Sequence, residues 1–302
     1  MKKFRHFLEY LFFLSVGFLA RLLPYRLALD LGARFGDFGF YCVPIRKQVA
    51  LANLARAFPE KSVAERQKIA RQVYRNLGIM TIEHLRFPRM TPEDLLALVE
   101  FENISILENA LKRGKGVIIT GGHFGNWEIM GCSISAAGHP TSFVVADIHN
   151  RFLDRMINDH RRLMGVKIIP KGMAIRGIMK DLAANRCVTI LIDQDAGKQG
   201  TFVEFLGQLA STPKGPATFA LKTGAALILT LSFRQPNGRL KVVFEEILTN
   251  DFSELNDESI NQITQRATTR LEQQIRAYPD HWFWMHRRWK TQLPTTENER
   301  ES

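Results

Sequence analysis

A histidine and a glutamate five residues apart form the pair in this sequence best suited to acid–base chemistry. They are His123 and Glu128, in the segment Thr120-Gly-Gly-His-Phe-Gly-Asn-Trp-Glu-Ile-Met130. A carboxylate that holds one ring nitrogen of a histidine fixes the tautomer and makes the other nitrogen more basic. Such a histidine can act as a general base toward an alcohol. We therefore predict a catalytic His123 oriented by Glu128, although a lone histidine in a turn is more often structural.

The glycines of this segment point to a close approach between backbone and substrate. Gly121, Gly122 and Gly125 carry no side chain that would block such an approach. The N–H groups at the start of the following helix can stabilise an oxyanion. We assign substrate-binding roles to Gly122 and to Asn126, which stands directly before that helix.

A second polar segment, Asp193-Gln194-Asp195, follows another apolar run. Asp193 or Asp195 can organise the site, for example by a hydrogen bond to His123. Two other interpretations remain open. An Asp-x-Asp pair before a glycine often caps a turn. In a metal-dependent glycosyltransferase the same pair holds a divalent cation and a nucleotide-sugar diphosphate, but that reading leaves His123 and Glu128 unexplained.

Strands alternating with helices must position these residues. After residue 102 the sequence predicts strands over residues 116–120, 142–146, 166–169, 188–192, 226–232 and 240–246, because β-branched runs bounded by glycine are typical of buried strands. It predicts helices over residues 126–136, 151–164, 174–184, 216–223 and 258–278. This alternation indicates an α/β fold with a central, mostly parallel sheet flanked by helices. His123 then lies at the edge of the sheet where ligands bind in such folds.

The composition is that of a globular protein, with an uneven distribution of charge. The chain has 302 residues and a net charge of +11. Residues 1–90 hold 16 Lys and Arg against 6 Asp and Glu, so nearly all of the excess lies in the N-terminal third. A basic segment of this kind can face nucleic acid or anionic lipid. The three cysteines, Cys42, Cys132 and Cys187, are far apart and indicate a reducing compartment rather than a disulfide framework.

An apolar stretch near the N-terminus favours lipid over nucleic acid. Residues 7–23 are apolar except for Glu9 and Arg21 near the ends, and the uninterrupted part is residues 10–20. This part is shorter than the roughly 20 residues that an ordinary spanning helix needs. A single-pass anchor and a helix that lies in the membrane interface are therefore both open, as is a first buried helix of a soluble domain. A signal peptide fits poorly because arginines follow the apolar stretch.

The domain organisation follows from these patterns. We predict a membrane anchor helix over residues 1–24, followed by one catalytic domain over residues 25–293. Residues 25–100 of that domain are predicted to be helical and basic, with a membrane-facing stripe or an ordinary solvated surface as the two interpretations. Residues 294–302 are predicted to form a disordered polar tail.

Several ordered motifs resemble one known family, the bacterial lipid A biosynthesis (lauroyl/myristoyl) acyltransferases of the lysophospholipid acyltransferase superfamily. The superfamily carries an H-x4-D/E signature, which His123 and Glu128 match. The resemblance covers nearly the whole chain. It includes the N-terminal hydrophobic helix and these further segments: Asn53-Leu54-Ala-Arg-Ala-Phe58, Arg161-Arg162-Leu-Met-Gly165, Asp193-Gln194-Asp195, Phe205-Leu-Gly207, Ala210-Ser-Thr212 and Gly215-Pro-Ala217.

The resemblance implies transfer of an acyl chain from an acyl carrier protein or CoA thioester to a lipid hydroxyl, at the cytoplasmic face of the bacterial inner membrane. The expected partners are membrane lipids, a glycolipid acceptor and acyl carrier protein, with no nucleic acid. The chemistry needs neither a metal nor another cofactor, because a thioester already has a good leaving group. The family's helix arginine matches Arg161, with Arg162 as the alternative, and implies that a guanidinium stabilises developing charge. Asp193 is assigned to the catalytic set, where it can bind His123 or Arg161.

Two more basic segments are interpreted from their surroundings. Lys214 precedes a predicted helix, where its side chain and the free amides suit a phosphate or phosphopantetheine, although a solvated lysine fits equally. The resemblance places residues 201–207 beside the acyl channel. The segment Trp282-Phe-Trp-Met-His-Arg-Arg-Trp289 has the composition of a membrane interface or a headgroup site, and we interpret its His286 as structural. Arg162, Asp195 and Lys214 complete the predicted substrate-binding set.

Three classes of function remain. The first is a membrane acyltransferase that acts on a lipid A precursor, or on another glycolipid or lysolipid by the same chemistry. The second is the metal-dependent glycosyltransferase that uses Asp193 and Asp195. The third is a membrane-bound lipid-binding protein without catalysis. We favour the acyltransferase because it alone uses His123, Glu128 and the arginine together.

Overall fold

A computed structural model describes residues 2–43 and 45–293 of the chain. Its centre is a seven-stranded sheet in the order β1-β9-β8-β2-β5-β3-β4. Every neighbouring pair is parallel except β8 and β9. The predicted α/β fold with a mostly parallel sheet is therefore confirmed. The strands are β1 (Val99–Glu102), β2 (Val117–Gly121), β3 (Thr141–Val145), β4 (Lys167–Pro170), β5 (Cys187–Leu191), β8 (Ala226–Arg234) and β9 (Leu240–Ile247).

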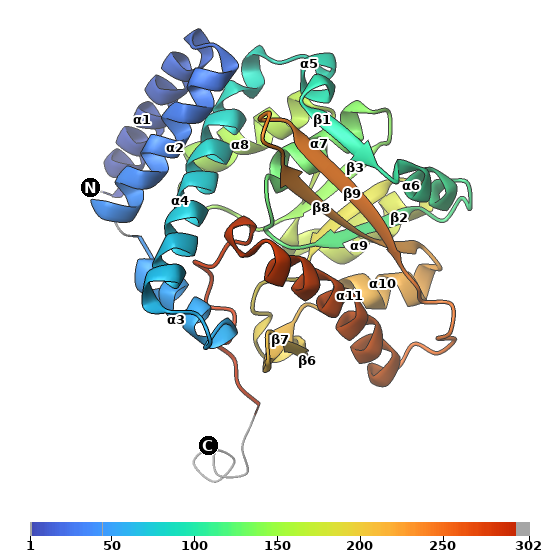
Figure 1. The fold of residues 1–302 in the computed structure, drawn as a ribbon. Coiled ribbons are helices and arrows are strands. Elements are labelled where there is room, and N and C mark those ends of the chain that lie inside the picture. Colours follow the sequence, from blue (N-terminus) through green and yellow to red (C-terminus); the bar gives the residue numbers. More distant parts are fainter. Residues whose placement is uncertain (1, 44, 294–302) are drawn as a thin grey trace.

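Helices cover both faces of the sheet (Figure 1). Alternate side chains of β2 point to opposite faces, so Val117 and Ile119 belong to one buried cluster and Ile118 to another. The first cluster includes residues of α5 (Pro92–Ala97), α6 (Ile104–Leu111) and α7 (Trp127–Ala136). The second includes residues of α9 (Ala174–Ala183), α10 (Gly215–Thr223) and α11 (Asp257–Ala277). The remaining helix of this half, α8 (Arg151–Leu163), connects β3 to β4.

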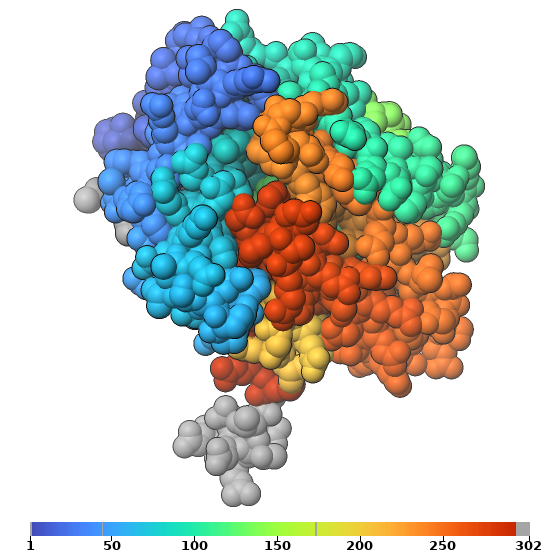
Figure 2. Space-filling model, viewed as in Figure 1, coloured from blue at the N-terminus to red at the C-terminus, as the bar shows by residue number. Residues whose placement is uncertain are grey.

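Four helices precede the sheet: α1 (Lys2–Leu22), α2 (Tyr25–Tyr41), α3 (Lys47–Ala57) and α4 (Val63–Arg86). The long α4 begins with a capping box, in which the Ser62 side chain and Glu65 satisfy each other's main-chain N–H groups. Glycines allow α2 to contact α4 at backbone distance, since a Cβ at Gly36 would lie 2.2 Å from the Tyr74 carbonyl oxygen. In the space-filling view, an orange-red region near the C-terminus lies at the front of the molecule, between the cyan surface of these helices and an orange region (Figure 2).

The N-terminal helix differs from the predicted membrane anchor. Helix α1 has the expected position, and its Gly17 and Ala20 are buried. Among the helices of residues 2–43 and 45–293, none is long and apolar enough to cross a membrane. The long apolar membrane helix of the sequence prediction is thus not found. The physical reason is that the uninterrupted apolar part, residues 10–20, spans only about 16 Å as a helix, against a hydrocarbon core of about 30 Å.

The predicted strands and helices after residue 102 all occur, with small shifts at their ends. Sequence patterns missed β1, α6 and a separate antiparallel hairpin of β6 (Thr201–Phe205) and β7 (Gln208–Thr212). Short elements give little periodic signal, which explains these omissions. The predicted polar tail, residues 294–302, lies outside the described residues.

Candidate active site

The centre of the site is a contact between His123 and Asp193. Strands β2 and β5 are parallel neighbours, so the loops that follow them meet at one edge of the sheet. The His123 imidazole Nδ1 lies 2.9 Å from Asp193 Oδ1, and the His123 main-chain N–H donates to Asp193 Oδ2 at 2.8 Å. A carboxylate only accepts hydrogen bonds, so the proton of the neutral imidazole sits on Nδ1. His123 Nε2 is left as a proton acceptor.

The pKa values of this pair move in opposite directions. Burial acts to lower the pKa of His123, but the charge and hydrogen bond of Asp193, together with the charge of Glu128, raise it above its ordinary value. Burial acts to raise the pKa of Asp193, but the nearby His123 and the N–H donors around the carboxylate lower it overall. Asp193 is thus ionised, and it increases the proton affinity of the histidine.

Polar and aromatic groups surround the free nitrogen of the histidine. The Gln194 amide nitrogen lies 3.4 Å from His123 Nε2. The Trp127 ring meets the imidazole edge-on, with centroids 4.9 Å apart, and the Phe283 ring lies 6.2 Å away. The His123 side chain nevertheless keeps 23% of its surface exposed, so a substrate can reach it.

Glu128 does not hold His123, which corrects the sequence prediction. Its carboxylate forms a two-pronged ion pair with Arg161 of α8, at 2.9 Å to Nε and 2.6 Å to Nη2. Arg161 also donates to Asn158 Oδ1 at 2.9 Å. Burial would raise the pKa of Glu128, but Arg161 lowers it. The side chain of Glu128 lies in the first turn of α7 and points toward α8. Asp193, and not Glu128, contacts the imidazole of His123.

The C-terminal aromatic segment, residues 282–289, contacts both His123 and Asp193. Trp282 Nε1 donates to Asp193 Oδ2 at 2.8 Å, and the Phe283 main-chain N–H donates to the His123 carbonyl at 3.0 Å. The interpretation of residues 282–289 as a membrane-interface segment is wrong for its tryptophans, which are all buried. Trp282, Trp284 and Arg288 are each at most 1% exposed. The aromatic composition reflects core packing against the loop that carries His123.

The glycine-rich loop is tightly bound to its surroundings. The main-chain N–H groups of residues 123–126 donate to Asp193, Gly122, His281 and Ser232 respectively. They are not free for an oxyanion. In the first turn of α7, the N–H groups of residues 129 and 130 are bonded to Asn126, whereas those of Trp127 and Glu128 make no hydrogen bond within the described residues and remain candidates. A Cβ at Gly122 would lie 3.2 Å from the Asp193 side chain. This glycine gives Asp193 room to reach His123.

Both polar groups of the Asn126 side chain are bonded within the protein, so this side chain is not an open contact for a substrate. Its Oδ1 caps α7 by accepting from the Ile129 N–H at 2.9 Å, and its Nδ2 donates to Glu83 Oε2 at 2.7 Å. The Glu83 carboxylate, on α4, accepts hydrogen bonds from two further side chains: Tyr25 donates to Oε1 and Arg234 donates to Oε2. Burial and the Glu83 charge raise the pKa of Tyr25, which therefore stays protonated. The network ties the N-terminal helices to the start of α7.

The other predicted substrate-binding residues lie outside the site. Arg162 pairs with Asp159 at 2.7 Å on the surface of α8. The Asp195 carboxylate accepts hydrogen bonds from the Gly197 N–H and from Thr291, so it caps a turn, as one of the interpretations of the sequence predicts. The Asp195 main-chain N–H donates to His286 Nε2. Asp193 and Asp195 thus face different partners and do not form a common cation site.

Lys214 is also distant from the reacting groups. It lies 3.9 Å from Asp257 at the start of α11, whereas Leu271 of the same helix lies against Gly122. Leu271 stands 14 positions after Asp257, which corresponds to about 20 Å of helix. The structure therefore does not bring the predicted phosphate-binding lysine to His123.

Sequence reasoning missed the contributions of Trp282, Gln194 and Glu83. Gln194 stands inside the quoted Asp193-Gln194-Asp195 segment, so its position at a strand end was an available signal. Trp282 lies 89 residues from Asp193, and Glu83 lies 43 residues from Asn126. No local pattern connects positions so far apart.

Comparison with known proteins gives a consistent answer. A family model described as bacterial lipid A biosynthesis acyltransferase matches residues 1–291. The chain is 26% identical over 282 residues to the lipid A biosynthesis palmitoleoyltransferase of Escherichia coli, covering 93% of this chain and 90% of the relative. It is 26% identical over 215 residues to the phosphatidylinositol mannoside acyltransferase of Mycolicibacterium smegmatis, covering 70% and 69%. It is 23% identical over 284 residues to the lipid A biosynthesis lauroyltransferase of E. coli, covering 92% and 90%.

Proposed function

Because the chain belongs to the bacterial lipid A biosynthesis acyltransferase family and is an acyltransferase, we propose that it transfers a fatty acyl chain from a thioester to a hydroxyl of a glycolipid acceptor of the lipid A type. The proposed donor is acyl carrier protein or CoA carrying the acyl chain. The observation that carries the mechanism is the Asp193–His123 contact, which leaves His123 Nε2 as the base.

In the proposed reaction, His123 Nε2 takes the proton of the acceptor hydroxyl. The oxygen attacks the thioester carbonyl carbon, and the tetrahedral intermediate then expels the thiolate. The thiolate takes the proton back from the imidazolium. Asp193 stabilises that imidazolium without accepting a proton, since its pKa is lowered. The main-chain N–H groups of Trp127 and Glu128, in the first turn of α7, are the proposed donors to the oxyanion.

Glu128 and Arg161 have a supporting part in this mechanism. Their side chains are only 10% and 13% exposed, so leaving either charge unpaired would destabilise the folded protein. The charge of Glu128 raises the pKa of His123, and that of Arg161 lowers it. We propose that the pair fixes the orientation of α8 against α7. We also propose that its two charges have opposing effects on the pKa of the His123 imidazole, which limits the net shift.

Membrane association is proposed to occur through one outer face of the N-terminal helices. Exposed apolar residues recur on α1 at intervals of three and four, which places them on one side of the helix. Such a face, backed by the protein, suits a helix lying in the interface of the cytoplasmic face of the inner membrane. The exposed residues are Phe4, Phe7, Leu8, Leu11, Phe12, Phe18, Leu19 and Leu22 on α1, with Leu27, Phe35, Phe38 and Tyr41 on α2.

The test is transfer of a labelled acyl group in detergent, with acyl carrier protein and CoA as alternative donors. Three acceptors are compared: a lipid A precursor, a phosphatidylinositol mannoside and a lysophospholipid. His123→Ala is expected to lower the rate about 10²- to 10⁴-fold, the usual contribution of a general base. His286→Ala serves as the matched control, since the His286 side chain accepts from the Asp195 N–H and makes no hydrogen bond to His123 or Asp193 within the described residues.

The outcomes separate the parts of the proposal. Activity on the lipid A precursor that disappears in His123→Ala supports both chemistry and acceptor class. Activity on only one of the other two acceptors keeps the chemistry and replaces the acceptor. A His123→Ala variant that is as active as wild type contradicts the general-base role.

A further inference from the structure

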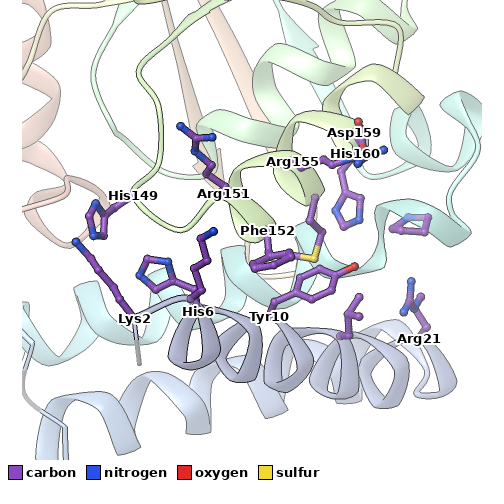
Figure 3. Close-up of a pocket in the computed structure, with 14 residues that line it drawn as sticks. Lys2, His6, Tyr10, Arg21, His149, Arg151, Phe152, Arg155, Asp159 and His160 are labelled. Carbon is purple, nitrogen blue, oxygen red and sulfur yellow. The ribbon is translucent and has the colours of Figure 1, made fainter.

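A large cleft lies between α1 and α8, outside the His123 site. Its volume is about 1320 Å³. Side chains at positions 151, 152, 155, 156, 159 and 160 line it from α8, which is one face of that helix. Lys2, His6 and Tyr10 extend toward them from α1 (Figure 3). The cleft is therefore built from two helices that are joined through their facing side chains.

The cleft is strongly cationic. Five lysines and arginines line it, against the single carboxylate of Asp159. Asp159 is already shared between Arg155 at 3.6 Å and Arg162 at 2.7 Å. The other four cations make no ion pair among the residues that the structure describes. They are Lys2, Lys3, Arg21 and Arg151.

Histidine and aromatic side chains complete the lining. His6 and His149 meet edge-on with ring centroids 5.2 Å apart, and Tyr10 stacks on Phe152 at 5.7 Å. His160 is only 8% exposed, lines the cleft, and its buried Nδ1 has no hydrogen-bond partner. The lining thus offers hydrogen-bond donors and cations beside an apolar floor.

Helix α8 links the cleft to the active site. His160 lines the cleft, while its neighbour Arg161 holds Glu128 on the other side of the helix. The His160 ring also packs against that of buried His84, with centroids 5.1 Å apart. A ligand in the cleft therefore lies one helix away from the catalytic loop.

We propose that this cleft binds a phosphate group carried by the lipid acceptor, an inference that rests on the proposed acyl transfer to a lipid. Phosphate attracts arginine and lysine and accepts hydrogen bonds from them, and four cations without carboxylate partners meet that need. The aromatic floor suits the apolar part of the same molecule. Binding there holds the acceptor beside α8 while its hydroxyl meets His123.

An anionic lipid fits the cleft better than the acidic surface of a carrier protein. The lining is concave and extends between two helices, whereas a folded protein partner docks on a more open surface. The exposed apolar side chains of α1, including Phe4, Phe7 and Leu11, lie on the same helix that forms one wall. A lipid held at that apolar face can place its headgroup in the cleft.

The test compares two double variants that each remove two positive charges. Arg21→Gln/Arg151→Gln removes one unpaired cation from each wall. Arg176→Gln/Lys180→Gln is the matched control on exposed positions of α9. The cleft variant is expected to raise the KM for a phosphorylated lipid acceptor about tenfold at nearly unchanged kcat, because the lost contacts act equally in ground and transition states. An acceptor from which the phosphate has been removed should show no such difference between variant and wild type.

A binding measurement keeps the proposal separate from catalysis. Co-sedimentation with phosphatidylcholine vesicles, with and without phosphatidic acid, needs no acyl transfer. Wild type and the control are expected to bind more tightly when phosphatidic acid is present, and the cleft variant is expected to lose that gain. A wild-type protein that transfers no acyl group to any acceptor but still binds phosphatidic acid vesicles more tightly would reject the proposed function. The cleft would then remain assigned as a site for a lipid phosphate.

Three results would overturn the cleft assignment. The first is a cleft variant that behaves like the control in both assays. The second is a KM that changes for acyl carrier protein and not for the acceptor, which assigns the cleft to the donor protein. The third is inorganic phosphate binding as tightly as the phosphatidic acid vesicles, which identifies a site for free anions. Thermal unfolding of each variant verifies that a loss of binding is not a loss of fold.

Discussion

Replacing Asp193 by asparagine changes the tautomer of the proposed base while keeping the shape of its partner. Asp193 Oδ2 accepts from two N–H donors, the His123 main chain and Trp282 Nε1, both at 2.8 Å. In Asp193→Asn, the amide oxygen must take that place, because the amide nitrogen would face two donors there. The amide nitrogen then faces His123 Nδ1 and donates to it. The imidazole proton moves to Nε2, which can no longer accept the proton of the acceptor hydroxyl.

The size of the effect follows from this forced tautomer. Asp193 is only 3% exposed, so water does not offer the amide an alternative arrangement. Loss of the base costs about 10²- to 10⁴-fold, and a carboxylate-to-amide change beside a catalytic histidine lies near the upper end of this range. The rate constant kcat is expected to fall to that extent, with little change in the KM for the acceptor.

The assay is the pH dependence of kcat in Asp193→Asn and wild type. The wild-type rate should rise with pH as His123 loses its proton, at a pH above the ordinary pKa of histidine, because Asp193 and Glu128 raise the pKa of His123 against the effect of burial. Removing the Asp193 charge lowers that pKa, so the residual activity of the variant should reach its plateau at a lower pH. Asp195→Asn is the matched control, since Asp195 caps a turn and contacts Thr291.

The reasoning is refuted if Asp193→Asn keeps wild-type kcat, or if its activity needs a higher pH than that of the wild type. A loss of activity that Asp195→Asn shares to the same extent would point to a general disturbance of the loop. Thermal unfolding of both variants tells this case apart from a specific effect on the base.

Three further predictions concern stability and geometry. Arg161→Met leaves the buried Glu128 carboxylate unpaired and should cost about 3–5 kcal/mol in chemical denaturation, whereas adding Glu128→Met should recover part of that loss. His123 has a raised pKa in the folded state, so its contribution to the unfolding free energy is full below about pH 6.5 and is lost as the pH rises through that raised value. That alkaline loss should be absent from the stability profile of His123→Gln. Gly122→Ala puts a Cβ 3.2 Å from Asp193 and should lower kcat while costing about 1–3 kcal/mol of stability, and a variant with unchanged kcat would show that Asp193 has room to move.

The chemical types at the site could be read from the sequence, but their pairing could not. His123, Glu128, Arg161 and Asp193 were all predicted, and all four lie at or beside one sheet edge. The short spacing between His123 and Glu128 suggested a direct contact. The structure instead directs the Glu128 side chain to α8, because the first turn of α7 points it away from the loop.

Aromatic composition was similarly ambiguous. Trp282 and its neighbours have the residue types of a membrane interface, yet Trp282, Trp284 and Trp289 are buried behind the loop that carries His123. Aromatic residues suit both settings, since each offers a large apolar body with a polar tip. Only the position of the segment relative to the sheet distinguishes the two.

By itself, the sequence determined the order and kind of the main elements after residue 102 and the residue types available for acyl transfer. Local hydrophobic periodicity and glycine positions act over a few residues, so they can be read without a fold. The tertiary structure decided that Asp193 is the partner of His123, that Glu128 is the partner of Arg161, and that α1 and α8 enclose a cationic cleft. These contacts join positions 33 to about 150 residues apart. Their formation depends on how the sheet and the helices pack, which no local pattern specifies.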